Sequence, residues 1–463
     1  MKLIDCLLEN MSQWEACLPQ ERSVERVSDL GLGLLCGLGR RTITRAISFH
    51  GNTQKDWSAD YKMFSRSPWE PRDLFAPILR EAIAQHELER LVMSVDDTRV
   101  WRTGRHVPQA QWHRDPMGPA FQTNLGWGHR FLQASLVLPL YTQDKVSSAR
   151  SIPIRWEMAP VVKKPGGKAV ADEWTRYHAE KKEKNLSRQF VSLVQELRQH
   201  LDQTGQEKKP LIVTGDGSFC NRTVLAYPWQ EHRVSLVLRC RKDIVLCKAA
   251  QSSGRRFYGK TKFTPEKVRR WDGLAEWHGA SIFHGGRYRN VRFKELSQVY
   301  WQRGGKKQPL RLIVLASTGY RQSKHGRQQY HKPAYLLTTD LTTPAAILIQ
   351  DYFDRWAIEV NHRDEKEILG VGQAQVWNEK SVCKVPALIV AMYSWLLLSA
   401  LECYGPTRTS AYLPLPAWRG PAKRASCQDM VALLRKQLAD QPTSFPTGDG
   451  PPTARSMVLT AAA

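Results

Sequence analysis

The chain has 463 residues, enough for two or three domains, and 42% of them are apolar, which excludes a wholly disordered protein. An excess of Lys and Arg gives a formal net charge of +24 at pH 7. That charge is far more than an enzyme of neutral metabolites needs, so a polyanionic partner is the simplest explanation. Because the basic residues are interleaved with 16 Trp, nucleic acid is favoured over an acidic membrane surface.

Nine cysteines are scattered without a C-x2-C pair. This predicts reduced thiols that pack as small apolar residues, and neither a zinc ribbon nor a disulfide framework. The first residues, MKLIDCLLENMSQWEACL, carry acids where a secretory signal needs an apolar run, so we expect a cytoplasmic protein. Residues 385–401 are uncharged, but they are short for a membrane span and include Pro386. A buried helix is the better interpretation, and no membrane contact is expected.

Residues 1–85 are predicted to be helical. An apolar run from Leu30 to Leu38 leads into the basic stretch RRTITR at 40–45. This region is a candidate DNA-binding unit, and the alternative is a helical cap with a solvated basic face. No clear helix-turn-helix pattern is present, so the sequence leaves both interpretations open.

From Leu91 the pattern changes to short apolar runs that predict β-strands. LVMSVDD at 91–97 ends in two carboxylates. FLQASLVLPL at 131–140 and SIPIRWEM at 151–158 are two further strand candidates. Three strands in succession suggest a meander.

A helix and another strand follow this meander. The apolar residues of the helix recur at helical spacing: Phe190, Leu193, Val194, Leu197 and Leu201. PLIVTGD at 210–216 is a buried strand that again ends in an acid. The order β-β-β-α-β-α predicts an α/β protein with a ribonuclease-H-like core, in which carboxylates on neighbouring strands meet at one edge of the sheet.

The rest of the chain divides into three parts. Residues from about 220–340 contain strand-like runs broken by basic turns, and we expect a β-rich insertion within a domain that spans 86–404. A long helix follows, with Thr343 as its expected N-cap and Pro344 at its first position. Residues 405–463 are rich in Pro, Ala, Arg and Ser, which predicts a loosely ordered tail.

Carboxylates at these places suggest a chemistry. Cleavage or transfer of a phosphodiester needs an activated oxygen nucleophile and a stabilised leaving oxygen, and two metal ions about 4 Å apart supply both. Mg²⁺ binds carboxylate oxygens, water and phosphate, so an Asp, Asp, Glu set holds it without Cys or His. Asp96 or Asp97, Asp216 and Glu359 form such a set. Each acid alone is a weak signal, because strand ends often carry acids as turn residues.

The long helix strengthens that signal. Tyr352, Arg355, Glu359 and Lys366 are three, four and seven residues apart, so at 100° per residue they lie within a stripe of about 60°. A carboxylate flanked by Arg, Lys and Tyr can hold a metal ion while its neighbours hold a phosphate. The alternative is a surface ladder of salt bridges, each worth a few tenths of a kcal/mol.

The stretch YLLTTDLTTPAAILIQDYFDRWAIEVNHRDEKEILGVGQ resembles the C-terminal signature of the insertion-sequence DDE transposases, which carry a Tyr-x2-Arg-x3-Glu-x6-Lys pattern. All four positions of the pattern match. VTGDGSF and SVDDT resemble the family segments around the second and the first Asp. The resemblance therefore covers about residues 90–400, and the N-terminal region and the tail lie outside it.

The resemblance implies a fold, a cofactor and partners. The fold is a ribonuclease-H-like core with a β-rich insertion before the Glu helix, and the cofactor is Mg²⁺, for which Mn²⁺ can substitute. The partners are double-stranded DNA with terminal inverted repeats and target DNA, held by a homodimer in the synaptic complex. The implied activity is cut-and-paste transposition, often through a DNA hairpin, by a protein associated with the bacterial nucleoid.

The resemblance also implies a role for each acid. Asp96, Asp216 and Glu359 would form the catalytic, metal-binding triad. Family members usually place the first ligand two residues before a Thr or Ser, which favours Asp96 over Asp97. Strand alternation agrees that only one of these two can meet Asp216, because adjacent residues point to opposite faces.

Other residues would contact DNA. By the same resemblance, Tyr352, Arg355 and Lys366 would hold the phosphate at the transposon end. Three tryptophans of the insertion are candidates to stack on an unpaired or flipped base, although core packing is the commoner role of a Trp: Trp271, Trp277 and Trp301.

Two other functions stay open on sequence alone. A ribonuclease-H-like nuclease without strand transfer would share the triad and the metal ions. A transposase-derived DNA-binding regulator would not cut. The intact acids argue against the regulator, because a protein that only binds DNA has no physical reason to keep uncompensated carboxylates in a basic cleft.

Overall fold

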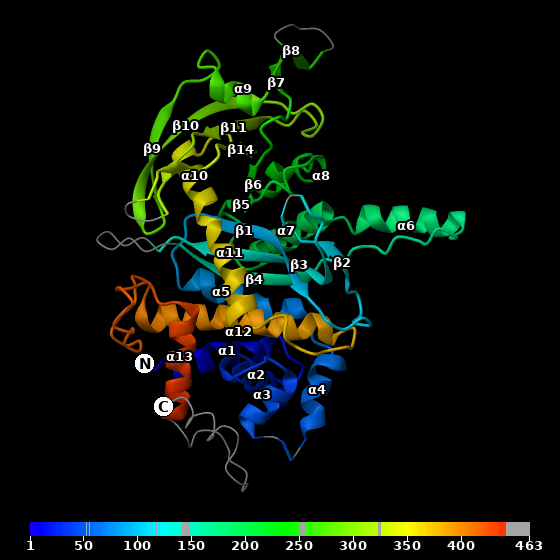
Figure 1. Cartoon of the computed structure of the whole chain (residues 1–463), viewed down its shortest axis with the longest axis vertical. Coiled ribbons are helices and arrows are strands. Elements are labelled where there is room, and N and C mark those ends of the chain that lie inside the picture. The colour runs from blue at the N-terminus through cyan, green and yellow to red at the C-terminus, as the bar shows by residue number, and fades with distance from the viewer. Residues whose placement is uncertain are drawn as a thin grey trace.

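A computed structural model gives the structure of the protein. Figure 1 shows three regions along its long axis: helices from both ends of the chain, a central sheet, and a strand-rich extension. The structure describes residues 1–51, 53–54, 56–115, 118–119, 121–140, 149–250, 256–322 and 326–440.

The first part of the chain is helical, as predicted. The five helices pack together with α12 (Ser381–Tyr404), and α5 also contacts the sheet. Two 3-10 turns, η1 (Gln13–Ala16) and η2 (Pro71–Leu74), connect some of them. The helices are α1 (Leu3–Ser12), α2 (Glu21–Cys36), α3 (Ile43–His50), α4 (Trp57–Ser65) and α5 (Phe75–Ala84).

The helix α12 contains the uncharged segment at 385–401. In the described part of the chain it is the one helix long and apolar enough to cross a membrane, but 94% of its apolar window is buried inside the protein. Residues from α1, α2, α4 and α5 cover it. The prediction of a buried core helix is confirmed.

The contact between α1 and α12 corrects the expectation for the cysteines. Cys6 and Cys403 form a disulfide there, whereas the sequence predicted only reduced thiols. The two are 397 residues apart in the chain, so no local spacing could reveal the pair. The other seven cysteines are free, and several are buried as small apolar residues: Cys36, Cys240, Cys247 and Cys427.

The C-terminal segment is more ordered than its composition suggested, as far as the structure describes it. The helix α13 (Cys427–Ala439) begins with a capping box between Ser426 and Asp429. Met430 and Leu434, one turn apart, are fully buried. This apolar spacing within a Pro-rich and Arg-rich context was the overlooked signal. Residues 441–463 lie outside the described residues, so a loose tail stays a prediction there.

The central sheet has ten strands in the order β2-β3-β1-β5-β6-β14-β11-β10-β9, with β4 paired to β3. β1 pairs antiparallel with β3 and parallel with β5, which is also parallel to β6. The predicted strands are all present, and β2 was not predicted. The first six strands are β1 (Leu91–Trp101), β2 (Gln111–Arg114), β3 (Leu125–Leu138), β4 (Arg150–Met158), β5 (Leu211–Gly215) and β6 (Val234–Arg239).

The strand-rich region predicted at about 220–340 continues this sheet, because β14 pairs antiparallel with β6. β6, which pairs with β5, falls within the range expected for the insertion. The small hairpins β7–β8 and β12–β13 are separate. The elements are α8 (Arg222–Leu225), η3 (Trp229–His232), β7 (Leu246–Ala249), β8 (Tyr258–Phe263), α9 (Pro265–Arg270), β9 (His278–His284), β10 (Arg287–Val299), β11 (Leu310–Leu315), β12 (Gly319–Tyr320), β13 (Gln329–Tyr330) and β14 (Ala334–Thr338).

Helices cover both faces of the sheet, and β5 shows the division. Ile212 belongs to an apolar cluster with Leu348 of α10 (Ala345–Asp354), whereas Val213 belongs to the larger core with Leu193 of α7 (Leu186–Gln203). Alternate residues of the strand thus face different helices. Another helix, α6 (Ala171–Glu183), has no buried residue and projects from the body (Figure 1). It was not predicted, because it has no apolar face to give a periodic signal.

The predicted long helix is divided. It consists of α10, α11 (Trp356–Arg363) and a π-helical turn η4 (Asp364–Ile368). Pro344 is the N-cap of α10, so the helix begins one residue later than predicted. Thr343 instead donates its hydroxyl to Asp340 Oδ2 at 2.7 Å. Asp340 Oδ1 also accepts the amides of the turn before the helix, which explains the difference.

Candidate active site

Two of the predicted acids lie where β1 and β5 run side by side. Asp96 is in β1, and Asp216 directly follows β5, its parallel neighbour. In these strands Ser94 Oγ and Thr214 Oγ1 are 3.0 Å apart, so their even-numbered residues share a face. Asp96 and Asp216 continue that row on the face that α10 covers.

The electrostatics show that carboxylates are crowded at this edge. The pKa of Asp96 is raised to about 6, mainly by burial. The charges of Asp216 and Asp97 also raise this pKa, whereas His362 and Arg355 lower it. Burial likewise raises the pKa of Asp97, and Asp216 adds to that shift. The crowding favours a bound cation or proton at this edge.

Asp97 has different surroundings from Asp96. In the pairing with β3, Asp97 lies opposite Leu132 and Asp96 opposite Gln133, on alternate faces. The nearest cation to Asp97 is Arg99, at 3.6 Å. Its buried Oδ2 has no hydrogen-bond partner among the described residues.

Arg355 joins Asp96 to Glu359. It lies between α10 and α11, with Nη1 3.3 Å from Asp96 Oδ2 and Nη2 2.8 Å from Glu359 Oε1. Its side chain is only 10% exposed, whereas that of Glu359 is 34% exposed. One guanidinium thus lies between two of the three predicted triad members.

An ion pair and apolar contacts fix α10 on the sheet. Arg90, just before β1, donates to both carboxylate oxygens of Asp351 at 2.6 and 2.7 Å. Asp351 is 4% exposed, and Leu348 and Ile349 pack in the same apolar cluster as β1 and β5. Such a buried, bidentate pair restricts the helix to one orientation, and so fixes the position of Arg355.

Tyr352 and Lys366 also lie near this arrangement. The ring of Tyr352 is 5.6 Å from the guanidinium carbon of Arg355. Lys366 is in the π turn, so the stripe expected from α-helical spacing does not extend to it. Asp96 and Asp97 nevertheless act on Lys366. Loss of hydration lowers the pKa of Lys366, and the two acids partly offset that shift.

His362 and Glu365 were missed by the sequence analysis. Both are buried, and His362 Nδ1 is 3.3 Å from Glu365 Oε2. His362 Nε2 has no hydrogen-bond partner among the described residues, and the charge of His362 acts on Asp96. Its place one turn after Glu359 on the same helix was the available signal.

The three tryptophans have different environments. Trp277 lies between Arg292 and Lys294, whose charges are 5.1 and 4.9 Å from its ring. Trp271 is 53% exposed. Trp301 packs against the larger core, so of the three it most resembles a structural tryptophan.

Carboxylate oxygens are the donors that divalent magnesium prefers, so the residues fit such an ion chemically. The described residues nevertheless contain no group of three or more His, Cys, Asp or Glu close enough to hold a metal ion. Arg355 accounts for part of this, because it occupies the space between Asp96 and Glu359. The residue types suit a metal site, but Asp96 and Glu359 are both paired with the guanidinium of Arg355.

Crowded carboxylates at the edge of a mixed α/β sheet, in a strongly basic protein, are typical of nucleases that act with divalent cations. A family model described as DDE superfamily endonuclease matches residues 15–306. The match covers more than half of the chain, so the protein belongs to this family. No curated protein matches the chain.

The family match refines the picture in two ways. It begins at residue 15 and so includes most of the N-terminal helices, which the sequence resemblance did not cover. It includes Asp96, Asp97 and Asp216 but ends before Glu359. Membership makes the protein a nuclease-type enzyme with DNA as the implied substrate, and such enzymes generally use divalent metal ions.

Proposed function

We propose that the protein is an insertion-sequence transposase that cuts and joins DNA strands at the ends of its element, with Asp96, Asp216 and Glu359 as its catalytic, metal-binding triad. One observation carries the proposal. Arg355 contacts Asp96 across 259 residues of chain and also contacts Glu359, and Asp216 acts on Asp96 from the neighbouring strand. A purely structural ion pair would need only one of these acids.

The sheet supports a ribonuclease-H-like core. Its order β4-β3-β1-β5-β6 has three antiparallel strands followed by two that run parallel to β1. This is the arrangement expected from the predicted order of elements. The added strands lie between β6 and the helix that bears Glu359, where the insertion was expected.

In the proposed mechanism the three acids would hold Mg²⁺, or Mn²⁺ in its place, which activates the attacking oxygen and neutralises charge on the leaving one. Asp96 must be deprotonated to take part, and its pKa of about 6 leaves it mostly ionised at pH 7. Arg355 offsets one of the two negative charges of Asp96 and Glu359, which reduces their repulsion of phosphate. Tyr352 and Lys366 border the acids and would hold the phosphate at the element end.

The proposal includes partners and place. The substrates are double-stranded DNA with terminal inverted repeats and target DNA, brought together by a homodimer associated with the bacterial nucleoid. A nuclease without strand transfer and a non-cutting regulator are the alternatives. The raised pKa of Asp96 argues against the regulator. It shows that burying this carboxylate costs folding free energy, which a protein that only binds DNA has no need to spend.

The test compares Glu359→Gln with the wild-type protein on a labelled duplex that bears the element's terminal repeat, with Mg²⁺, Mn²⁺ or a chelator. The substitution keeps size but removes a charge that binds metal, so cleavage should fall about a thousandfold or more. DNA binding should be retained. Glu367→Gln is the matched control, because Glu367 is an exposed acid of the adjoining turn.

Each outcome separates the candidates. Loss of cleavage in Glu359→Gln protein but not in Glu367→Gln protein supports the triad. Joined products from the wild-type protein support transposition over hydrolysis. Binding without nicking under any metal would favour the regulator. Equal cleavage by wild-type and Glu359→Gln protein would show that the triad is misassigned.

A further inference from the structure

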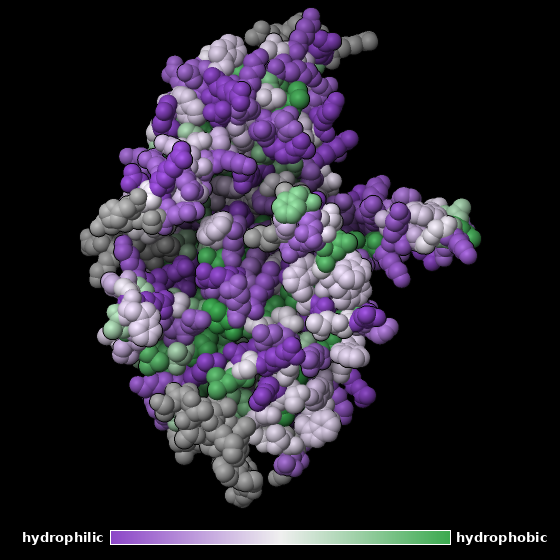
Figure 2. All heavy atoms as spheres, in the orientation of Figure 1, coloured by the Kyte–Doolittle hydropathy of each residue, from purple (hydrophilic) through white to green (hydrophobic). Residues whose placement is uncertain are grey.

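A second polar region lies in the strand extension, away from the paired acids. It is a cavity of about 600 Å³ that the turn after Trp301 shares with β8 and α8. Tyr258, Gln302 and Gly304 contribute to its wall. Its charged lining residues are all basic: Arg222, Arg303, Lys306 and Lys307. Figure 2 shows hydrophilic side chains gathered over this extension of the molecule.

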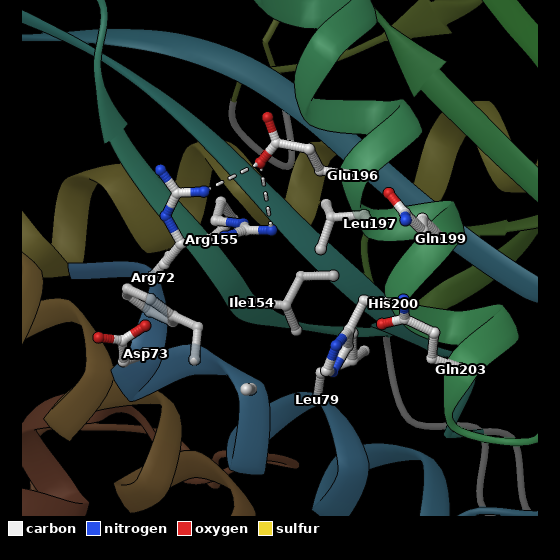
Figure 3. A pocket seen from close by; sticks show the side chains of 12 residues that line it. Arg72, Asp73, Leu79, Ile154, Arg155, Glu196, Leu197, Gln199, His200 and Gln203 are labelled. Atoms are coloured by element: carbon white, nitrogen blue, oxygen red, sulfur yellow. Dashed lines mark ion pairs between the residues drawn. The ribbon is translucent and has the colours of Figure 1, made fainter. Parts of the chain in front are cut away.

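The cavity between η2, β4 and α7 is an informative contrast (Figure 3). It also contains arginines, but Arg155 and Arg72 lie 3.9 and 3.7 Å from the carboxylate of Glu196. Their charges are therefore balanced within the protein. In the basic cavity no described carboxylate lines the wall, so its four cations repel one another without compensation.

The lysines are held in place by the backbone. Lys306 and Lys307 have φ of +45° and +64°, a conformation that is unfavourable for residues other than glycine. The amides of Gly304 and Gly305 donate to the carbonyl of Trp301 at 3.0 and 2.7 Å. A strained turn that presents two lysines to a cavity is costly for folding, which suggests a functional reason for it.

Side-chain contacts also support this wall. Tyr258 accepts the amide of Lys307 at 3.1 Å, and the Lys307 ammonium lies 5.3 Å from the ring of Phe257. Gln302 accepts a hydrogen bond from Lys262. The ring of Trp301 covers Gly304 so closely that a Cβ there would clash. The cavity is thus preformed, which lowers the entropic cost of binding a ligand.

Arg222, which also lines the cavity, is close in sequence to Asp216. Arg222 begins α8, and Asn221 caps that short helix by accepting the amides of Thr223 and Val224. The chain reaches it from Asp216 through a turn in which Asp216 accepts the amide of Ser218 at 2.9 Å. Arg222 follows Asp216 by six residues, so the two backbones lie at most roughly 22 Å apart.

We propose that the basic cavity binds the phosphate backbone of a DNA strand at a place separate from the cleavage site. Four cations with no carboxylate among the described lining residues select a polyanion, and Arg and Lys are the side chains that hold phosphates. The volume of about 600 Å³ exceeds the need of one phosphate. The inference rests on the proposed function only in that the polyanion is DNA.

The experiment compares two pairs of adjacent lysines. Lys306→Gln/Lys307→Gln removes two charges from the cavity, and Gln at these positions adds no backbone strain beyond that of Lys. Lys208→Gln/Lys209→Gln is the matched control, since it removes two charges just before β5, at the end of that strand away from Asp216. The affinity of the full chain for a labelled duplex is measured over a range of salt with a chelator, so that no cleavage occurs.

The cavity variant should lose two phosphate contacts. The slope of log affinity against log salt should fall by about 1.8, which corresponds to roughly thirtyfold weaker binding at 0.15 M salt if the lines meet at 1 M. The control pair should keep the wild-type slope. Equal losses in both pairs would overturn the proposal, because net charge alone would then explain binding. No loss in either pair would also overturn it, because the cavity lysines would then contact no phosphate.

Two further measurements complete the test. Arg303→Gln, at a position of the same turn that has no positive φ, should lower the slope by about 0.9, which covers the case in which the double variant folds poorly. Inorganic tripolyphosphate is the probe for a small ligand. If it binds the wild-type protein and loses affinity in the lysine variant while the DNA slope is unchanged, the cavity holds a small polyphosphate and the DNA proposal is wrong.

This inference and the proposed function can fail separately. A normal slope in Lys306→Gln/Lys307→Gln protein, together with metal-dependent cleavage by the wild-type protein, would refute only the cavity. A reduced slope in a protein that never cleaves would support the cavity and refute the transposase. The two experiments therefore use different variants and different readouts.

Discussion

The acids at the sheet edge and the bases of the cavity both crowd like charges, but in different surroundings. Asp96 is mostly buried and has an internal counter-ion in Arg355, whereas Lys306 and Lys307 line an open cavity without a carboxylate. A buried acid cluster suits a small ion that can lose its water. An open basic cavity suits a large anion that stays hydrated. Crowding of like charges therefore selects a different kind of ligand in each of the two regions.

The two regions also differ in support. Asp96 belongs to a strand paired on both sides, with β3 and β5. The lysines belong to a turn whose backbone is strained. Chemistry at a metal ion tolerates small errors of position poorly, so a sheet is the appropriate support. Binding of a flexible backbone is more tolerant, and a turn is sufficient.

The largest expected effect tests which acid belongs to the site. Asp96→Asn should lower single-turnover cleavage with Mg²⁺ by about a thousandfold or more, because it removes a charge that faces Asp216 and Glu359. Asp97→Asn should lower it by about tenfold or less, because Asp97 lies on the alternate face with Arg99. The reverse order would assign the metal to Asp97.

Local patterns predicted much of this site, and contacts distant in sequence supplied the rest. The strands that bear Asp96 and Asp216 were predictable because each is a buried run that ends in an acid. The position of Arg355 was not, since its contact with Asp96 spans 259 residues. Its assigned role as a phosphate ligand stays a prediction, and the structure adds that its guanidinium is already occupied.

Other differences also have causes that local sequence patterns do not reveal. The π turn at Asp364–Ile368 has no signature in hydrophobic periodicity, so Lys366 could not be placed by counting residues. The disulfide of Cys6 and Cys403 depends on helix packing across the whole chain. The ribonuclease-H-like assignment, the domain limits and the metal ligands stay predictions.

A smaller effect concerns stability and pH. The folded-state pKa of Asp96, about 6, lies above its ordinary value of 3.8. The folded protein therefore binds more protons than the unfolded chain between these values, and this acid makes stability fall as pH rises through that window. A shift of about two units sets an upper limit of about 3 kcal/mol for the loss.

Denaturant unfolding at pH 4.5 and pH 8, in a chelator, measures this loss. Wild-type protein should lose more free energy of unfolding between the two values than Asp96→Asn, which cannot ionise there. Other buried acids, such as Asp351, titrate in both proteins and cancel in the comparison. Added Mg²⁺ at pH 8 should stabilise the wild-type protein more than the variant. Equal pH dependence of the two proteins would contradict the raised pKa.

The smallest effect asks whether one DNA molecule contacts both regions. Lys366 is exposed beside the acids, so Lys366→Ala should lower the salt slope by about 0.9, or weaken binding roughly fivefold at 0.15 M salt. Arg355→Ala should leave the slope unchanged without metal, because Arg355 is paired with Asp96 and Glu359. Titration of a long duplex with a chelator measures both slopes.

Combining Lys366→Ala with the cavity variant then tests the connection. If one strand passes from the acids into the cavity, the losses of slope should add on a long duplex, because independent phosphate contacts contribute separately. On a duplex too short to reach both regions, only one of the two losses should appear. Additive losses on the short duplex as well would mean that separate DNA molecules occupy the two regions, and a single strand shared by the acids and the cavity would be ruled out.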